Sequence, residues 1–337
     1  MNPQSAMKPA TKKTLTSANE RLLQYGDRTR RGSAAHTVLS DGTAFYAMLP
    51  ILTYVVLNEG SSKGVDDHDP VAGVAVRDNV RFGTAVNRLV DTMDLVAGLL
   101  FADDEERELI AKTIGELHRF VEGTLDDGTR YHAWNKELWA WTWAGILKPV
   151  IDAYEILHGP QSQEFLDDAY IGTLQLGDLI GVRGLPDTYG EFLEYWEKQW
   201  IPKALDTGTG RFIANLPVNL PRPATAPWIP QAVWNTIYWP VRNVLLTSSF
   251  IVMEPRLRHL IDIEPTPADR VSVGVHRLIW RAVPRALTGE LFGTYLTLRL
   301  RYGNTSWKRH YSPAALADRR KQVEHARAQG LPQPKRH

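Results

Sequence analysis

The sequence predicts an all-α protein built as a single multi-helix domain. Stretches with apolar residues at helical spacing recur along the 337 residues, separated by capping residues, glycine and proline. Runs of alternating apolar and polar residues, which would indicate strands, do not recur. No segment of about 20 to 50 residues repeats, so a solenoid of stacked repeats is not expected.

The N-terminal part of the chain shows clear start and stop signals for helices. A capping box at residues 17–20 opens a short helix that Gly26 closes, and residues 41–58 read as a buried helix kinked at Pro50. Residues 58–70 are rich in glycine, serine and charge, so a loop is expected there. Further helices are expected at residues 71–78, 84–101, 104–122 (with Asp103 or Asp104 as its cap) and 135–157.

The C-terminal part continues the pattern. Gly159 and Pro160 stop one helix, Ser162 opens the next, and a second capping box runs from Thr188 to Glu191. Residues 206–231 carry so many prolines and glycines that they are expected to form a crossing loop. Helices are then expected at residues 232–253, 266–282 (with Thr266 as its cap) and 285–300.

Composition limits the classes of partner. The formal net charge is +1 and 23% of residues are charged, which carries no overall signature of nucleic-acid or membrane binding and favours a small partner. The sequence has no cysteine, so any metal must be held by histidine or carboxylate. The N-terminus lacks the apolar segment of a signal peptide, and the apolar run 44–57 is too short for a transmembrane segment. A cytoplasmic location is therefore expected.

Standard catalytic motifs are missing. The sequence contains no P-loop, no dinucleotide-binding glycine pattern, no paired-histidine zinc motif and no nucleophile elbow. Neither nucleotide binding nor hydrolase chemistry is indicated.

Three residues form the strongest candidate site. Arg88 and Thr92 lie one helical turn apart, so both side chains can point at one object. His118 follows on the next helix, four residues after Ile114 and three before Val121, and it is expected to face inward with that apolar stripe. Such a histidine is either a core residue with both nitrogens satisfied by neighbours or a neutral imidazole that ligates haem iron.

Three other clusters leave alternatives open. One cluster could bind a divalent ion or be a solvated run of loop residues: Asp66, Asp67, His68 and Asp69. A second could stack on a flat cofactor or pack in the core: Trp134, Trp139, Trp141 and Trp143. From Lys308 onward eight Lys or Arg face two acids, which predicts a solvated helix with a frayed tail or a contact with an anionic surface.

Four features follow one another between residues 88 and 154. They are the pair R88-L-V-D-T92, the acidic turn F101-A-D-D-E-E-R107, the histidine context I114-G-E-L-H118-R-F-V-E-G123, and a Trp-bearing helix that ends in a Tyr, Tyr154. In order and spacing, the stretch of roughly residues 70–200 resembles the MpaB-type oxygenase family, a haem-containing group that includes the latex-clearing rubber oxygenases.

The resemblance implies a globin-like helical core around haem b, with His118 as the iron ligand and with Arg88 and Thr92 in the cofactor pocket. It also implies O2-dependent oxidation or cleavage of hydrophobic substrates, notably isoprenoid chains. Arg88 and Thr92 are expected to be catalytic, as hydrogen-bond donors to dioxygen or to a developing oxyanion. The alternatives are a salt bridge from Arg88 to a haem propionate or a core carboxylate, and a bond from Thr92 to its own helix.

The sequence departs from the latex-clearing branch at two places. Those enzymes carry a lysine immediately before the threonine, where this chain has Asp91, and a glutamate upstream of the arginine, where this chain reads DPVAGVAV. Cleavage of polyisoprene is therefore not expected. Candidate replacement bases are Asp67, His68, Asp69 and Asp91.

Together these features predict a haem-dependent oxygenase that acts on a small hydrophobic, isoprenoid-like substrate with O2 and an unidentified electron donor. The alternatives are a haem-binding sensor or carrier without turnover and a helical protein without haem. The expected organisation is an N-terminal extension at residues 1–30, a helical haem-binding domain at 31–305 and a basic tail at 306–337.

Overall fold

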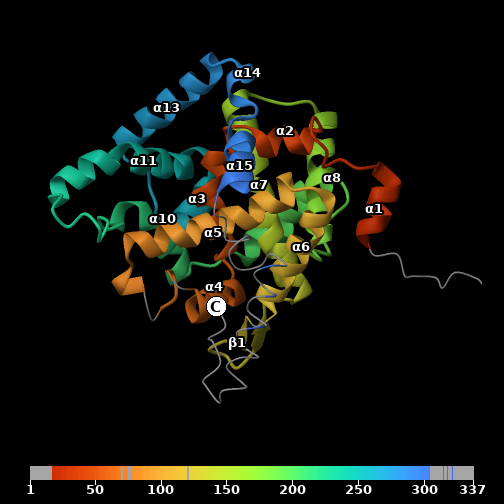
Figure 1. Ribbon diagram of the computed structural model, residues 1–337, viewed down its shortest axis with the longest axis horizontal. Helices are drawn as coiled ribbons and strands as arrows, with labels where there is room; N and C mark the ends of the chain where they lie inside the picture. The colour runs from red at the N-terminus through yellow and green to blue at the C-terminus, as the bar shows by residue number, and fades with distance from the viewer. Residues whose placement is uncertain are drawn as a thin grey trace, which may run out of the picture.

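A computed structural model describes residues 17–69, 71–74, 77–119 and 121–303, together with residues 314, 317 and 321. These residues confirm the all-α prediction, since they form fifteen α-helices and one two-stranded sheet (Figure 1). The helices are α1 (Ser17–Tyr25), α2 (Ala34–Ser40), α3 (Ala44–Val55), α4 (Glu59–His68), α5 (Phe82–Phe101), α6 (Asp104–His118), α7 (Lys136–His158), α8 (Gln163–Leu179), α9 (Tyr189–Tyr195), α10 (Gly208–Asn219), α11 (Gln231–Val252), α12 (Pro255–Leu260), α13 (Pro267–Ala282), α14 (Arg285–Thr288) and α15 (Leu291–Tyr302). The globin-like arrangement of the core stays a prediction.

Helices α3 and α7 pack against each other at the centre of the molecule (Figure 1). Between them and the segment after α9, Trp141 stacks on Trp200 with ring centroids 3.9 Å apart, and Trp200 stacks on Trp196 at 4.0 Å. The indole N–H of Trp141 donates to the carbonyl of Val55 at 3.1 Å. Trp141 is therefore a core residue, as the packing alternative for the aromatic helix predicted.

Helices α5 and α6 form an antiparallel hairpin on one side of this core. The Asp103 side chain accepts a hydrogen bond from the Glu106 N–H and caps α6, as expected. Gly98 lies against Ile110, since a Cβ at Gly98 would lie 2.1 Å from the Ile110 Cδ1 atom. The buried Asp94 carboxylate pairs with Arg299 and joins α5 to α15. These contacts fix the two helices that carry the candidate site.

Two segments expected to be loops contain helices. Residues 58–70 hold α4, because the Asn58 side chain accepts the N–H groups of Gly60 and Ser61 and caps the helix. Residues 206–231 hold α10, capped by Thr207, which accepts the Gly210 N–H. A Cβ at Gly210 would lie 2.8 Å from the Leu57 side chain. That glycine therefore permits close packing where the sequence suggested a chain break.

Other boundaries differ from expectation at turns. The expected helix 41–58 begins at Ala44, because the Asp41 side chain accepts the Thr43 N–H in a turn that separates α2 from α3. The expected helix 285–300 is two helices, α14 and α15. In the expected helix 71–78, the described residues form turns and a short 3-10 helix, Arg77–Asn79.

A small antiparallel hairpin follows α6, where the sequence indicated no strand. Strand β1 (Glu122–Thr124) pairs with β2 (Arg130–His132), and Gly128 takes a positive φ of 88° in the turn between them. Helix α6 therefore ends at His118 and not near residue 122, and Val121 lies outside it. His132 lies in β2 and accepts the N–H of Trp134.

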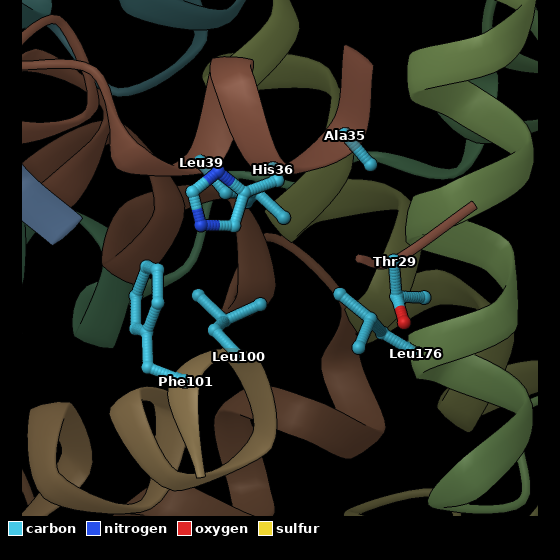
Figure 2. Close-up of a pocket in the computed structure, with 7 residues that line it drawn as sticks. All are labelled: Thr29, Ala35, His36, Leu39, Leu100, Phe101 and Leu176. Atoms are coloured by element: carbon cyan, nitrogen blue, oxygen red, sulfur yellow. The ribbon is translucent and has the colours of Figure 1, made fainter. Parts of the chain in front are cut away.

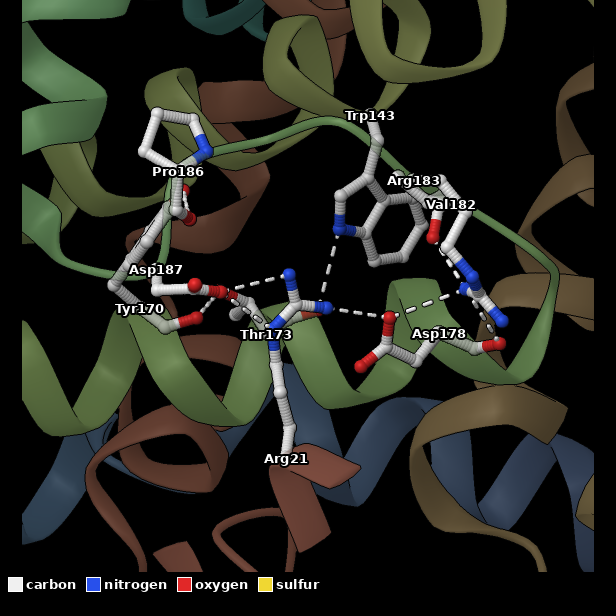
Figure 3. A network of polar contacts seen from close by, with 9 residues as sticks. All are labelled: Arg21, Trp143, Tyr170, Thr173, Asp178, Val182, Arg183, Pro186 and Asp187. Atoms are coloured by element: carbon white, nitrogen blue, oxygen red, sulfur yellow. Dashed lines mark hydrogen bonds and ion pairs between the residues drawn. The ribbon is translucent and has the colours of Figure 1, made fainter. Parts of the chain in front are cut away.

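The N-terminal helix α1 is joined to α8 by an ion-pair network (Figure 3). Arg21 reaches Asp178 at 2.6 Å, and Arg183 reaches the same carboxylate at 3.2 Å. The Asp178 side chain is buried, and this burial raises the pKa of its carboxyl above the ordinary value although Arg21 opposes the shift.

None of the helices in the described ranges is long and apolar enough by itself to cross a membrane. The segments α2 and α3 pass that test only when taken together, and they meet at an angle of 88°. The basic tail at residues 306–337 lies almost entirely outside the described residues.

Candidate functional site

Arg88 and Thr92 contact each other on α5, as their spacing predicts. A terminal guanidinium nitrogen of Arg88 donates to the Thr92 hydroxyl, and that hydroxyl donates to the Arg88 carbonyl at 3.0 Å. The second bond is the one expected if Thr92 bonds its own helix. It leaves the Thr92 oxygen oriented toward the guanidinium.

Asp69 holds the other side of the Arg88 side chain. Its Oδ2 atom lies 2.8 Å from the Arg88 Nε atom, and its Oδ1 atom accepts the N–H groups of Val71 and Ala72 at 2.8 and 2.9 Å. The Asp69 side chain is 11% exposed, whereas that of Arg88 is 45% exposed. A carboxylate with both oxygens engaged is suited to positioning Arg88 and poorly suited to serve as a general base.

His118 lies in the last turn of α6, with one ring nitrogen engaged. The Nδ1 atom lies 2.8 Å from the Ile114 carbonyl oxygen, one turn earlier in the helix. A carbonyl can only accept, so Nδ1 carries the proton and the lone pair of the neutral ring is on Nε2. Among the described residues nothing hydrogen-bonds to Nε2. The described residues therefore engage one ring nitrogen of His118, and both alternatives for this histidine stay open.

The surroundings of His118 keep its ring neutral. Burial lowers the pKa of His118 below its ordinary value, and the positive charge of Arg88 lowers it further. The Ile114 carbonyl acts in the opposite direction, but the net shift is downward. Helices α5 and α6 therefore bring Arg88 and His118 into one electrostatic environment.

Two tryptophans hold the C-terminal turns of α6. The ring of Trp139 meets the His118 ring edge to face, with centroids 4.9 Å apart, and its N–H donates to the Ile180 carbonyl at 2.9 Å. The indole N–H of Trp134 donates to the Gly115 carbonyl at 2.9 Å. These contacts fix the position of the imidazole.

The polar cluster at residues 66–69 is divided among separate partners. Asp66 pairs with Arg77 at 2.5 Å, Asp67 pairs with Lys63 at 3.1 Å, and His68 bonds the Glu122 carbonyl. Asp67 also accepts the Tyr131 hydroxyl, which contributes to lowering the pKa of that carboxyl. Across the described ranges, no group of three or more His, Asp or Glu could hold a metal ion. The cluster therefore connects the end of α4 to its neighbours.

The small cavity in Figure 2 lies elsewhere, beside the C-terminal end of α5. It has a volume of about 10 Å³, and its walls are Thr29, Ala35, His36, Leu39, Leu100, Phe101 and Leu176. That volume is close to the size of one water molecule. His36 bonds Ser40 and meets the Phe101 ring edge to face, so it is a structural residue and not a second ligand candidate.

Sequence reasoning missed two residues of the site. The sequence indicates Asp69 as part of a polar cluster and as a candidate base but not as the partner of Arg88, because that contact brings together the end of α4 and the middle of α5. The sequence indicates Trp139 as one of four tryptophans that stack on a flat cofactor or pack in the core but not as the neighbour of His118, because that contact joins α7 to α6. Neither contact has a signal in local spacing.

Comparison with known proteins gives one match. The model of the family described as "ER-bound oxygenase mpaB/B'/Rubber oxygenase, catalytic domain" matches residues 40–285, which is more than half of the chain. This range includes Asp69, Arg88, Thr92, His118 and Trp139. Neither the curated proteins nor the solved structures gave a match.

Proposed function

Because this chain belongs to the family of mpaB and rubber oxygenase catalytic domains, we propose that it is a haem-dependent oxygenase in which His118 ligates the iron of haem b. The family is of the oxygenase type, and membership supports an enzymatic role. The haem cofactor, its ligand His118 and the substrate class go beyond family membership and are proposals.

The observation that carries the proposal is the tautomer of His118. Histidines that ligate metals usually donate their other ring N–H to a backbone carbonyl or carboxylate, which orients the ring and raises its basicity. The Nδ1 bond to Ile114 is of this kind, and it leaves the Nε2 lone pair for a metal. The lowered pKa keeps that lone pair unprotonated at neutral pH. The Nε2 atom of His118 would therefore suit the iron of a haem held by one histidine.

When bound, the haem supplies the iron at which O2 is activated. The guanidinium of Arg88 is held by Asp69 and Thr92. Nothing among the described residues engages its second terminal nitrogen, so this N–H group can donate to a developing negative charge. The competing role is a salt bridge from Arg88 to a haem propionate. Asp69 is proposed as the residue that positions Arg88 in either role.

The proposed substrate is a small hydrophobic molecule. Asp91 and the upstream segment without glutamate separate this chain from the polymer-cleaving branch, so no activity on polyisoprene is expected. Carbonyl ends released from polyisoprene under O2, detected with a carbonyl reagent and absent with His118→Ala, would contradict this restriction. The cytoplasmic location stays a prediction.

A haem-binding sensor or carrier without turnover is the second candidate. One observation favours it: Arg88 and Thr92 bond each other and Arg88 also bonds Asp69, so part of their donor capacity is used inside the protein.

Oxygen uptake by the purified, haem-loaded protein with a chemical reductant separates the two candidates. The proposed oxygenase consumes O2 and an added small hydrophobic alkene in proportion. Reversible O2 binding with no consumption of any alkene in a broad panel would instead support the carrier.

A further inference from the structure

Helix α13 presents two faces of different character. Its inward face is attached to the core: His276 bonds the Tyr46 hydroxyl at 2.8 Å, Ser272 bonds Thr247 at 2.9 Å, and Trp280 meets the Tyr46 ring edge to face. Figure 1 shows the helix at the outer edge of the molecule, above α11. The inward contacts therefore determine which side faces outward.

The outward face carries large apolar side chains. Val271, Val275, Leu278 and Ile279 are 67%, 47%, 68% and 52% exposed, and none of the residues of α13 is buried. Their spacing of three and four residues places them on one stripe. Leu287, soon after the helix, is also exposed. A contiguous apolar stripe at the surface indicates a binding face.

Three arginines flank this stripe on one side. Arg270, Arg277 and Arg281 are spaced by seven and four residues, so they share one side of the helix, next to the apolar residues. In the described parts of the chain no acid forms an ion pair with them. The acid on the same helix, Asp269, is engaged with Thr266 in the capping box. The positive charge of the flank is therefore available to a ligand.

We propose that α13 docks the protein on an anionic lipid surface, with its apolar stripe in the acyl boundary and its arginines at the lipid phosphates. A helix that is apolar on one face and basic beside it is the form that lies in a membrane interface. Each arginine near an anionic leaflet adds to the attraction. This inference does not depend on the proposed enzymatic function.

Charge favours an anionic lipid surface over two other occupants of this face, a second copy of α13 and the segment 304–337. In an antiparallel two-fold contact between two α13 helices, the arginines of both copies would lie along the same edge and repel each other. The segment 304–337 has eight Lys or Arg and two Asp or Glu, so it would also be repelled by the flank. An anionic lipid surface attracts both the flank and this segment.

The test is sedimentation of the full-length protein with lipid vesicles. Vesicles of phosphatidylcholine mixed with phosphatidylglycerol are expected to bind the protein about tenfold more tightly, or better, than vesicles of phosphatidylcholine alone. The double variant Val275→Glu, Leu278→Glu should lose binding to the mixed vesicles by about tenfold or more. The double variant Arg270→Gln, Arg281→Gln should lose the preference for anionic lipid.

The control is Leu193→Glu on α9, where the native side chain is 37% exposed, and it should bind as the native protein does. Circular dichroism checks that each variant is folded. Equal binding to both lipids, or binding that the α13 variants leave unchanged, overturns the proposal. Light scattering that shows a native dimer and a monomeric Val275→Glu, Leu278→Glu variant, or crosslinks from α13 to residues 304–337, would assign the face to another occupant and also overturn it.

Discussion

Arg88 connects the other residues of the proposed site. It donates hydrogen bonds to Asp69 and Thr92, and its positive charge contributes to lowering the pKa of His118. We expect Arg88→Ala and Thr92→Val to retain haem and to lower O2-dependent turnover. Arg88→Ala removes a preorganised donor, which costs roughly 3 kcal/mol, or about a hundredfold in rate. Thr92→Val removes the hydroxyl that accepts from the guanidinium and helps to hold it. Asp69→Asn should cause a smaller loss, since it removes only the positioning of the guanidinium.

The measurement is turnover per haem, with the haem content determined for each variant. Asp206→Asn, which removes an exposed partner of Arg211, is the matched control. Loss of haem from Arg88→Ala would assign that residue to a propionate, and native rates in all three site variants would make them structural.

At the same scale, the sequence nominated the candidate residues Arg88, Thr92 and His118 but not the partners that the structure gives them. Helical spacing is enough to place Arg88 beside Thr92 and to turn His118 inward, because both are properties of a single helix. The contacts of Asp69 with Arg88 and of Trp139 with His118 depend on how helices pack together. One sequence without a fold carries no signal for them.

The α5–α6 hairpin is the element that sets the position of His118. We expect Gly98→Val to destabilise the protein by about 1–3 kcal/mol, because the new side chain would overlap Ile110 in a packed interface. The double variant Gly98→Val, Ile110→Ala should recover part of this loss. Gly83→Val, on the same helix, is the control, since a Cβ at Gly83 meets nothing within 4 Å.

Thermal unfolding and haem affinity should be measured together. The single variant should lose both stability and affinity, because the shift of α6 moves the imidazole. Equal stability of Gly98→Val and Gly83→Val would show that the hairpin is not closely packed at this point.

Helices in which a capping residue precedes a run with apolar residues at helical spacing were largely predictable, as Asp103, Ser162 and Thr266 show. The helices α4 and α10 were not, because their glycines and serines favour loops in isolation and the helices are stabilised by caps and by neighbours. The Ser62 hydroxyl, for example, donates to Thr209 across the two helices at 3.0 Å. Tertiary contact here overrides local propensity.

For the whole molecule, three histidines make stability depend on pH. Burial lowers the pKa values of His36, His118 and His276 below the ordinary value of 6.5. The unfolded chain therefore binds protons first as the pH falls, and the native state loses stability below about pH 6.5 until the lowered pKa values are reached. Melting temperatures measured from pH 8 downward should decrease as the pH falls below about 6.5. A melting temperature that does not change with pH would contradict the burial of these rings.

The central claim is that His118 ligates haem iron, and the visible spectrum of the purified protein tests it most directly. The native protein is expected to show a Soret band. His118→Ala should lose it and keep its helical circular dichroism, whereas His276→Ala, which removes a histidine bonded to Tyr46 on another helix, should keep it. A full Soret band in His118→Ala, or no band in native protein supplied with haem, would contradict the account.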